Sequence, residues 1–292
     1  MSFNIFKTST RFFAVLLSCF FISSAIADDR YELRGNTVQG GVLFGKTLPG
    51  SQVKLDGRKI MLSDVGQFVL GFGRDNKNKA KLEITFPNGD VVSRVINVDS
   101  REYNIQRIDG LPKRKVTPMG KKTLERIRKE NREVADARKL RDERTDYAEG
   151  FIWPVKGRIS GVYGSQRVLN GKPRRPHFGI DIARPTGTPV KAPAGGVVTL
   201  AHPDMFFSGG TMIIDHGHGF SSAFLHLDEM LVPVGAVVKQ GDCVATVGAT
   251  GRVTGPHLDW RMNWLDQRVD PALLVPAMPK SFDKSDDRCE RK

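Results

Sequence analysis

The stretch GTPVKAPAGGVV, residues 187–198, shows the pattern that decides the fold. Short runs of β-favouring residues are separated by proline and glycine, and none has the 3.6-residue period of a long helix. The pattern extends in both directions, so we predict an all-β domain over residues 151–278, built as a folded antiparallel sheet. Its predicted strands are 195–201, 211–215, 221–226, 237–239, 243–248 and 256–262.

A second region of short strands lies between residues 28 and 110. Tight hairpin turns are predicted at Asp56-Gly57 and Asn88-Gly89. This spacing favours a small antiparallel β-sandwich-like domain. Because the region contains no histidine and no reactive cluster, we interpret it as a spacer or binding module. Its predicted strands are 38–44, 52–55, 67–72, 81–86, 90–98 and 103–108.

The segment 111–150 differs from both β regions because it is rich in lysine and arginine and poor in aromatic residues. Thr117 and Pro118 suit a helix start, since Thr caps a helix and Pro fits its first turn. The apolar stripe that follows is thin, so we predict one long, mostly solvated helix linking the two domains. A basic contact for anionic wall polymers is the alternative. Residues 279–292 are predicted to form a flexible polar tail.

The first 27 residues have the features of an export signal. Lys7 and Arg11 precede an apolar run over residues 12–22, and a small-x-small pattern ends at Ala27. The run is about half the roughly 20 residues that span a bilayer. We therefore predict cleavage after Ala27, no stable transmembrane segment afterwards, and a location in the periplasm or cell envelope. A loose lipobox at Cys19 leaves a lipoprotein as an alternative.

The formal net charge of +13 indicates a polyanionic partner. Export argues against nucleic acid and favours the anionic cell wall or membrane surface. Cys243 and Cys289 remain after the predicted cleavage, and they can pair as a disulfide in an oxidising compartment. Two separate thiols fit the sequence equally well.

All six histidines lie between His177 and His257, and this confinement favours a metal or acid-base site in the second β domain. On an ideal strand His177 and Asp181 would lie about 13 Å apart. They could not then share a zinc ion, whose bonds are about 2.0–2.2 Å long. Gly179, between them, is predicted to let the backbone bend.

The sequence His257-Leu258-Asp259 carries the second cluster. A period of two places His257 and Asp259 on one face of a strand and Leu258 on the other. One of the two polar side chains can then bind a metal while its neighbour reaches a water molecule on the ion. This is an arrangement that hydrolysis needs.

The remaining histidines are less informative. His226 ends an apolar run, and a histidine beside leucines is more often structural than catalytic. His216 and His218 occupy a glycine-rich hairpin turn, and we favour a turn role over metal binding for both. His202 precedes Pro203 and is predicted to lie in a loop.

Five ordered motifs resemble those of the LytM or lysostaphin-type zinc metallopeptidase family. The resemblance covers residues 154–275 and implies that family's β fold, a zinc ion and a peptidoglycan endopeptidase activity. The motifs are GRISGVYG at 157–164, HFGID at 177–181, GTPVKAPAGGVV at 187–198, HL at 226–227 and GATGRVTGPHL at 248–258.

The resemblance also assigns roles to individual residues. His177 and Asp181 match the first two zinc ligands. His257 matches the general base, and His226 matches a histidine that holds the substrate carbonyl. The family's third ligand is a histidine, where this chain has Asp259. Aspartate can bind zinc, but a second carboxylate brings the formal charge of the site to about zero and should weaken the ion as a Lewis acid.

We therefore predict a metalloendopeptidase with one zinc ion that hydrolyses the peptide cross-links of bacterial peptidoglycan. Its expected partners are peptidoglycan stem peptides and other cell-wall enzymes, and no nucleic acid. The alternative is a catalytically degenerate LytM-like module that binds and activates another cell-wall hydrolase. A metallopeptidase acting on a folded protein is a third reading, which no feature of the sequence favours.

Overall fold

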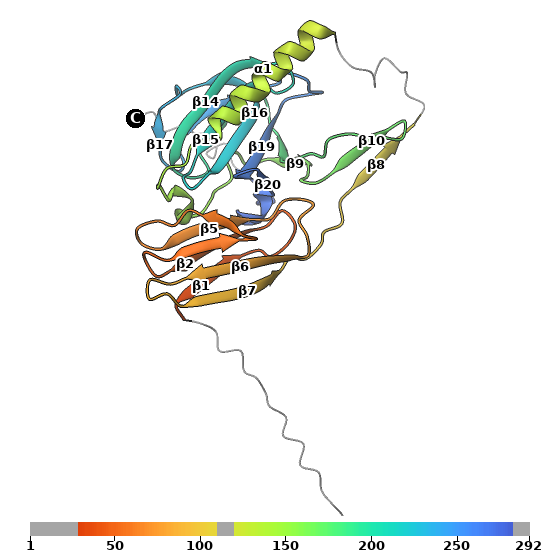
Figure 1. Cartoon of the computed structure of the whole chain (residues 1–292). Coiled ribbons are helices and arrows are strands. Elements are labelled where there is room, and N and C mark those ends of the chain that lie inside the picture. Colours follow the sequence, from red (N-terminus) through yellow and green to blue (C-terminus); the bar gives the residue numbers. More distant parts are fainter. Residues whose placement is uncertain (1–28, 110–119, 283–292) are drawn as a thin grey trace, which may run out of the picture.

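The computed structural model describes residues 29–109 and 120–282. Figure 1 shows a small β domain packed against one end of a larger β domain, with a single long helix lying across the larger sheet. The chain is thus mainly β structure, which confirms the predicted all-β fold class. The predicted export signal at 1–27, the helix start at Thr117, and Cys289 all lie outside the described residues.

The first domain consists of two antiparallel sheets that enclose one core. Strands β1 (Tyr31–Gly35), β2 (Val42–Thr47) and β5 (Gln67–Gly71) form one sheet in the order β1-β2-β5. The other has the order β4-β3-β6-β7, with β3 (Gln52–Leu55), β4 (Arg58–Ile60), β6 (Lys79–Thr85) and β7 (Val91–Asn97). The sandwich-like prediction is confirmed. Fully buried members of the core are Val53, Phe68, Leu70 and Ile84.

Turn residues set the limits of these strands. Asp56 and Gly57 have φ of 48° and 80°, as a type I′ hairpin between β3 and β4 requires. The predicted strand 38–44 begins too early, because Gly40 has a φ of 84° and interrupts the extended chain. Val38 forms only an isolated bridge with Asp99, and β2 starts at Val42.

The boundary between the domains differs from the prediction at residue 110. The predicted strand 103–108 appears as β8 (Ile105–Ile108), but it joins neither sheet of the first domain. It pairs in parallel with β10 (Gln166–Leu169), which in turn pairs with β11 (Lys172–Pro173). Residue alternation revealed the strand, whereas its partner lies about 60 residues further along the chain and left no local signal.

The second domain is a ten-stranded sheet in which every pair is antiparallel, as predicted. Its main path has the order β17-β14-β15-β16-β19-β12-β9. His202 lies in strand β14 and not in the predicted loop. The strands are β9 (Arg158–Gly161), β12 (Ile180–Ala183), β13 (Pro189–Lys191), β14 (Gly196–Met205), β15 (Gly209–Asp215), β16 (Phe220–Met230), β17 (Val237–Val238), β18 (Cys243–Val247), β19 (His257–Trp264) and β20 (Gln267–Val269).

Strand β19 separates the core from the site. Leu258, Trp260 and Met262 have no exposed surface and point into the core. By strand alternation, His257 and Asp259 therefore lie on the opposite face. The register of the strand thus decides which side chains are available for chemistry.

Helix α1 (Lys121–Ala137) packs on the second domain. Val134 and Ala137 contact a small apolar cluster of Ile213, Ala223 and Leu225 on β15 and β16. Glu130 is the one buried residue of the helix, so α1 is mostly solvated, as predicted, and only this face packs against the sheet. The apolar stripe is thin because the cluster that it covers is small.

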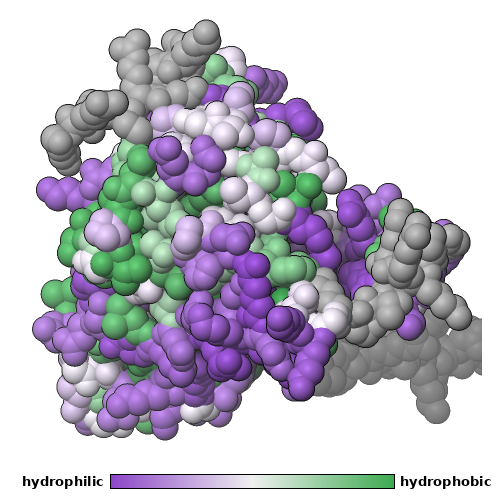
Figure 2. All heavy atoms as spheres, turned by 90° about the horizontal axis from the view of Figure 1, so that it is seen from above, coloured by the Kyte–Doolittle hydropathy of each residue, from purple (hydrophilic) through white to green (hydrophobic). Residues whose placement is uncertain are grey.

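The surface is mixed. Figure 2 shows hydrophobic residues gathered on the side where β17 lies, with hydrophilic residues across the centre of the view. Leu231, Val234 and Val237 are exposed near that strand. Within residues 29–109 and 120–282, no helix is both long and apolar enough to cross a bilayer. Cys243 is disulfide-bonded.

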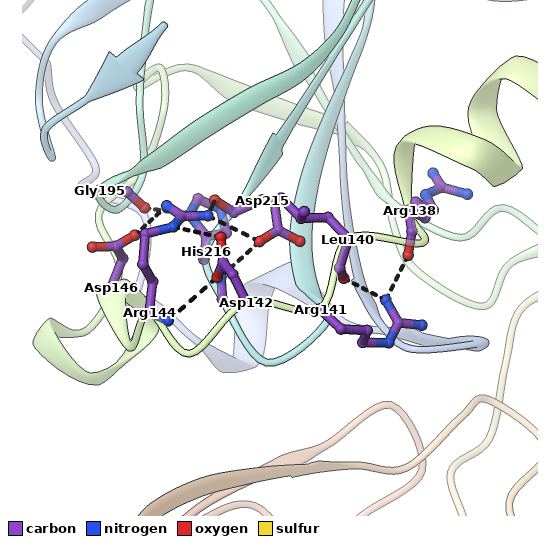
Figure 3. Close-up of polar contacts among 10 residues, drawn as sticks. Arg138, Leu140, Arg141, Asp142, Arg144, Asp146, Gly195, Asp215 and His216 are labelled. Carbon is purple, nitrogen blue, oxygen red and sulfur yellow. Dashed lines mark hydrogen bonds and ion pairs between the residues drawn. The ribbon is translucent and has the colours of Figure 1, made fainter. Parts of the chain in front are cut away.

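Arg144 joins the segment after α1 to the sheet. Figure 3 shows its guanidinium among Asp142, Asp146 and Asp215, with N–O distances of 2.8, 2.6 and 3.1 Å. Asp215, at the end of β15, is 1% exposed. Burial raises the pKa of Asp215 to about 6, although the hydrogen bond from the Gly217 backbone N–H and the charge of Arg144 both lower it.

Replacing Arg144 should destabilise the protein in a pH-dependent way. Arg144→Ala removes the positive partner of a buried carboxylate, and we expect a loss of roughly 2 to 3 kcal/mol in the free energy of unfolding at pH 8. Because the folded-state pKa of Asp215 is raised, ionisation opposes folding as pH rises through about 6. At pH 5 Asp215 is largely protonated in the folded protein, so removing Arg144 should cost less free energy of unfolding than at pH 8. Urea unfolding at both pH values measures the loss, and Arg128→Ala, at an exposed position on α1, is the control. A larger loss at pH 5 than at pH 8 would contradict the role of Arg144 as partner of the Asp215 carboxylate.

Candidate metal centre

Three predicted ligands meet at the junction of β12 and β19. Asp181 on β12 lies opposite Asp259 on β19 in the antiparallel register. His177 precedes β12, and its backbone is fixed by hydrogen bonds with Gly164 and Ser165. One ligand atom each from His177, Asp181 and Asp259 lies within 4.8 Å of the other two. The structure thus assembles a nitrogen and two oxygens at the spacing that a metal ion needs.

Gly179 has a different role from the one predicted. Its φ lies outside the left-handed region, so the bend between His177 and Asp181 does not require glycine. A Cβ atom at this position would lie 2.5 Å from Oδ1 of Asp259 and 2.7 Å from the backbone oxygen of Trp260. Glycine is needed here because a carboxylate and a neighbouring strand occupy the space of a side chain.

Two of the candidate ligand atoms have no hydrogen-bond partner within residues 29–109 and 120–282. Nε2 of His177 and Oδ1 of Asp181 are buried and contact each other at 3.2 Å, but neither has a hydrogen bond of regular geometry to any described residue. Buried polar atoms without partners cost free energy, and a metal ion is one of the groups that can satisfy them. The donor set of one imidazole and two carboxylates is acceptable to zinc. These residues therefore fit a metal ion.

The third candidate, Asp259, has a partner of its own. Nε of Arg261 donates to Oδ1 and Oδ2 of Asp259 at 3.0 and 3.1 Å, and Nη2 donates to Oδ2 at 2.5 Å. The Asp259 side chain is 3% exposed. Burial would raise its pKa, but the charge of Arg261 and these hydrogen bonds outweigh burial and lower it. Asp259 is therefore an anion that is already paired.

The negative charges also act on His177. Burial alone lowers the pKa of His177, but the contact with Asp181 and the charges of Asp259 and Asp181 outweigh it, and the pKa is raised. A protonated imidazole cannot bind a metal, so a proton competes with an ion for this ligand. An ion bound here would release that proton.

Two further histidines flank the three ligands. The rings of His226 and His257 are 4.9 Å apart between centroids. Nδ1 of His226 lies 2.9 Å from the Thr250 carbonyl, and Nδ1 of His257 lies 2.8 Å from the Gly255 carbonyl. Because a carbonyl only accepts hydrogen bonds, each neutral ring carries its proton on Nδ1 and leaves Nε2 with a free lone pair.

The backbone of His226 is unusual. Its φ of 66° is rare for a residue with a side chain, and such conformations often occur at functional sites. Burial lowers the pKa of His226, and the charges of His257 and Arg261 add to this effect, so the ring favours its neutral form. A neutral His226 offers a lone pair toward the site and not a proton.

The other three histidines lie away from the cluster. His216 has no exposed surface, with Nε2 2.7 Å from the Ser222 hydroxyl and Nδ1 2.6 Å from the Gly195 carbonyl. Nδ1 of His218 lies 2.9 Å from the Tyr147 hydroxyl. Both hold the β15–β16 hairpin, as the favoured turn role implied.

Arg261 is the site residue that the sequence analysis missed. A usable signal was present, because the alternation that places His257 and Asp259 on one face also places Arg261 there. The sequence HLDWR at 257–261 therefore predicts an acid and a base two residues apart on the same side of a strand. Only the rotamer of Arg261, and hence the ion pair, depends on the folded structure.

Comparison with known proteins gives consistent matches. The profile described as peptidase family M23 matches residues 175–271. The Vibrio cholerae protein named peptidoglycan DD-endopeptidase ShyB is 40% identical over 109 residues, which are 37% of this chain and 25% of that protein. The Neisseria meningitidis protein named DD-carboxypeptidase/endopeptidase Mpg is 37% identical over 126 residues, 43% of this chain and 29% of that protein.

A solved structure covers more of the chain. A Pseudomonas aeruginosa crystal structure assigned to peptidase M23 is 32% identical and has a TM-score of 0.63. The match covers 82% of this chain and 95% of that one. By contrast, the chain spans about a quarter of the length of the curated relatives it matches.

Substituting Gly179 should disturb the cluster without removing any ligand. In Gly179→Ala the added methyl group would overlap Asp259, so we expect a loss of about 1–3 kcal/mol in the free energy of unfolding and weaker zinc retention. Gly255→Ala is a matched control, since a Cβ there meets no atom within 4 Å. Thermal unfolding and zinc content after dialysis measure both effects. Equal behaviour of the two variants would contradict the close approach.

Proposed function

Because the chain belongs to peptidase family M23, we propose that it is a zinc-dependent endopeptidase that hydrolyses the peptide cross-links of bacterial peptidoglycan. The observation that carries the proposal is the meeting of His177, Asp181 and Asp259, two of whose buried atoms have no hydrogen bond to any described residue. The name of the Vibrio cholerae relative, peptidoglycan DD-endopeptidase ShyB, supports peptidoglycan as substrate. The proposed site of action is accordingly the periplasm or cell envelope.

The proposed ligands of one zinc ion are His177, Asp181 and Asp259. Zinc bound by three protein groups keeps an open position, acts as a Lewis acid and supplies a nucleophilic water at neutral pH. Arg261 offsets the charge of the second carboxylate. The formal charge of the site is then +1, from two carboxylates, one guanidinium and a divalent ion. One Asp and two neutral histidines around the same ion would also give +1. The predicted weakening of the Lewis acid by Asp259 is thereby reduced.

His257 is the proposed general base. Its Nδ1 proton is held by the Gly255 carbonyl, which directs the lone pair of Nε2 away from that carbonyl. The Nε2 atom lies 3.8 Å from Oδ1 of Asp181, at the edge of the ligand cluster. A water molecule that enters the cluster is therefore within reach of a proton acceptor.

His226 has a more restricted role than the family resemblance implies. To stabilise a developing oxyanion it must donate a hydrogen bond from Nε2, but its neutral form carries the proton on Nδ1. We propose that His226 accepts a proton during the reaction, or binds an N–H group of the substrate, and donates only when it is protonated. Its lowered pKa limits that form to acidic conditions.

The first test is zinc content together with cleavage of purified peptidoglycan sacculi. We expect one zinc ion per chain and release of uncross-linked fragments. Asp259→Ala should reduce zinc affinity by about 100-fold or more, since even groups behind the ligands contribute 10 to 100-fold. Asp228→Ala, exposed on β16, is the control.

Two results would overturn the proposal. Full zinc retention by Asp259→Ala would remove Asp259 from the ligand set. A protein without zinc or cleavage that stimulates a separate wall hydrolase would instead favour the non-catalytic activator. The pairing of Asp259 with Arg261 is the feature that such a protein would use to keep the carboxylate satisfied without an ion.

A second prediction separates the base from the ligands. His257→Ala should lower kcat for sacculus cleavage by about 10²–10⁴ while zinc remains bound, because the variant removes a proton acceptor and no ligand. His202→Ala on β14 should leave both quantities unchanged. Loss of zinc in His257→Ala would show that His257 is a ligand and that the roles need to be reassigned.

A further inference from the structure

A cluster of four arginines lies beside the proposed zinc ligands. We call Arg138, Arg175, Arg261 and Arg268 the arginine cluster. They come from four separate segments: the end of α1, the chain before His177, β19 and β20. Arg138 interacts electrostatically with Arg261 and Arg175, and Arg268 with the other three. Arg261 and Arg268 share the β19–β20 hairpin, and tertiary folding brings Arg138 and Arg175 to them.

The cluster has little negative charge to balance it. Asp259, bound to Arg261, is the one carboxylate within ion-pair distance of any of the four guanidiniums in the described parts of the chain. Arg268 donates to the side-chain oxygen of Asn263, a neutral group. The guanidinium of Arg175 lies 5.5 Å from the centre of the Phe178 ring. Three positive side chains thus lack an anionic partner among the residues described.

Two hydrogen-bond donors in this region are buried and have no partner in the part of the chain that the structure describes. They are Nε of Arg138 and Nδ2 of Asn263, and Asn263 as a whole is 1% exposed. Burial and the neighbouring arginines lower the pKa of Arg138 to about 10 and that of Arg268 to about 8. Positive charges and unused donors in one place are what an oxyanion site provides.

The cluster is reachable from solvent. The Arg261 side chain is 25% exposed. Arg268 and Phe178 line a cavity of about 640 Å³ between the two domains, which Arg74 and Lys77 also line. The charged residues lining this cavity are four basic ones, Arg74, Lys77, Lys79 and Arg268, and three acidic ones, Asp56, Asp75 and Asp266, of which Asp266 is paired with Arg58 outside the lining. A ligand entering from the cavity would therefore meet a net positive wall.

We propose that the arginine cluster is an oxyanion-binding subsite that takes a carboxylate group of the peptide substrate close to the scissile bond. Arg261 lies only about 6–7 Å along β19 from Asp259, so a carboxylate bound there would be close to the proposed zinc ligands. The inference therefore rests on the proposed peptidase function. Guanidinium groups bind carboxylates through paired, nearly planar hydrogen bonds, which suits a peptide carboxylate. Inorganic phosphate shares this chemistry and is the competing ligand.

The test measures binding to the metal-free protein, so that neither zinc nor catalysis contributes. The probes are a peptide ending in D-alanyl-D-alanine as the free acid and the same peptide as the C-terminal amide, each titrated by calorimetry. We expect the free acid to bind roughly 10-fold or more tightly, as hydrogen bonds to a charged group imply. Arg138→Gln and Arg268→Gln should each remove most of that preference. Arg132→Gln, exposed on α1, should keep it.

Several outcomes would overturn the subsite. They are equal affinity of the two peptides, no measurable binding of the free acid, or an unchanged preference in both Arg138→Gln and Arg268→Gln when thermal unfolding shows them folded. Inorganic phosphate is titrated in parallel. Phosphate binding that Arg268→Gln abolishes, with equal peptide affinities, would assign the cluster to phosphate. Because no cleavage is measured, an inactive protein that still prefers the free acid would contradict the proposed function and leave the subsite intact.

Discussion

The contact between Asp259 and Arg261 is the interaction on which the site depends. Asp259 is almost fully buried and lies directly opposite Asp181, so two carboxylates share one small region. An unpaired carboxylate in that position would be strongly destabilising. Arg261 binds it through three hydrogen bonds and compensates its charge, which allows an acidic residue to occupy this position. The pair is neutral as a unit, as a histidine would be.

The geometry around this pair follows from the packing of β12 against β19. Leu258, Trp260 and Met262 fix the register of β19, because a shift by one residue would move their apolar side chains out of the core. Gly161 on β9 and Gly179 just before β12 then leave room for the carboxylates. A Cβ at Gly161 would lie 2.1 Å from Oδ2 of Asp181, and one at Gly179 would overlap Asp259. Core packing and chemistry are therefore set by the same strand.

The rest of the chain completes the surroundings of the site. Helix α1 packs on the sheet, and the segment after it, tied to the sheet through Arg144, starts with Arg138 of the arginine cluster. The first domain packs against the other end, where a Cβ at Gly71 would lie 2.9 Å from Cβ of Trp264. Neither element contributes a candidate ligand. The segment after α1 contributes Arg138 to the arginine cluster, and the first domain contributes Arg74 and Lys77 to the cavity that Arg268 lines.

The sequence by itself determined the β fold of both domains, the hairpin at Asp56-Gly57, and the face of β19 that carries His257 and Asp259, because alternation and turn residues are local signals. Only the tertiary structure decided the partner of β8, the packing of α1, the reason for Gly179, and the proton positions on His226. The meeting of four arginines belongs to the same group, whereas for the pair of Asp259 and Arg261, two residues apart on β19, the fold decided only the rotamer of Arg261. These features depend on distances between segments remote in sequence, and such distances are fixed only when the sheet closes on its core.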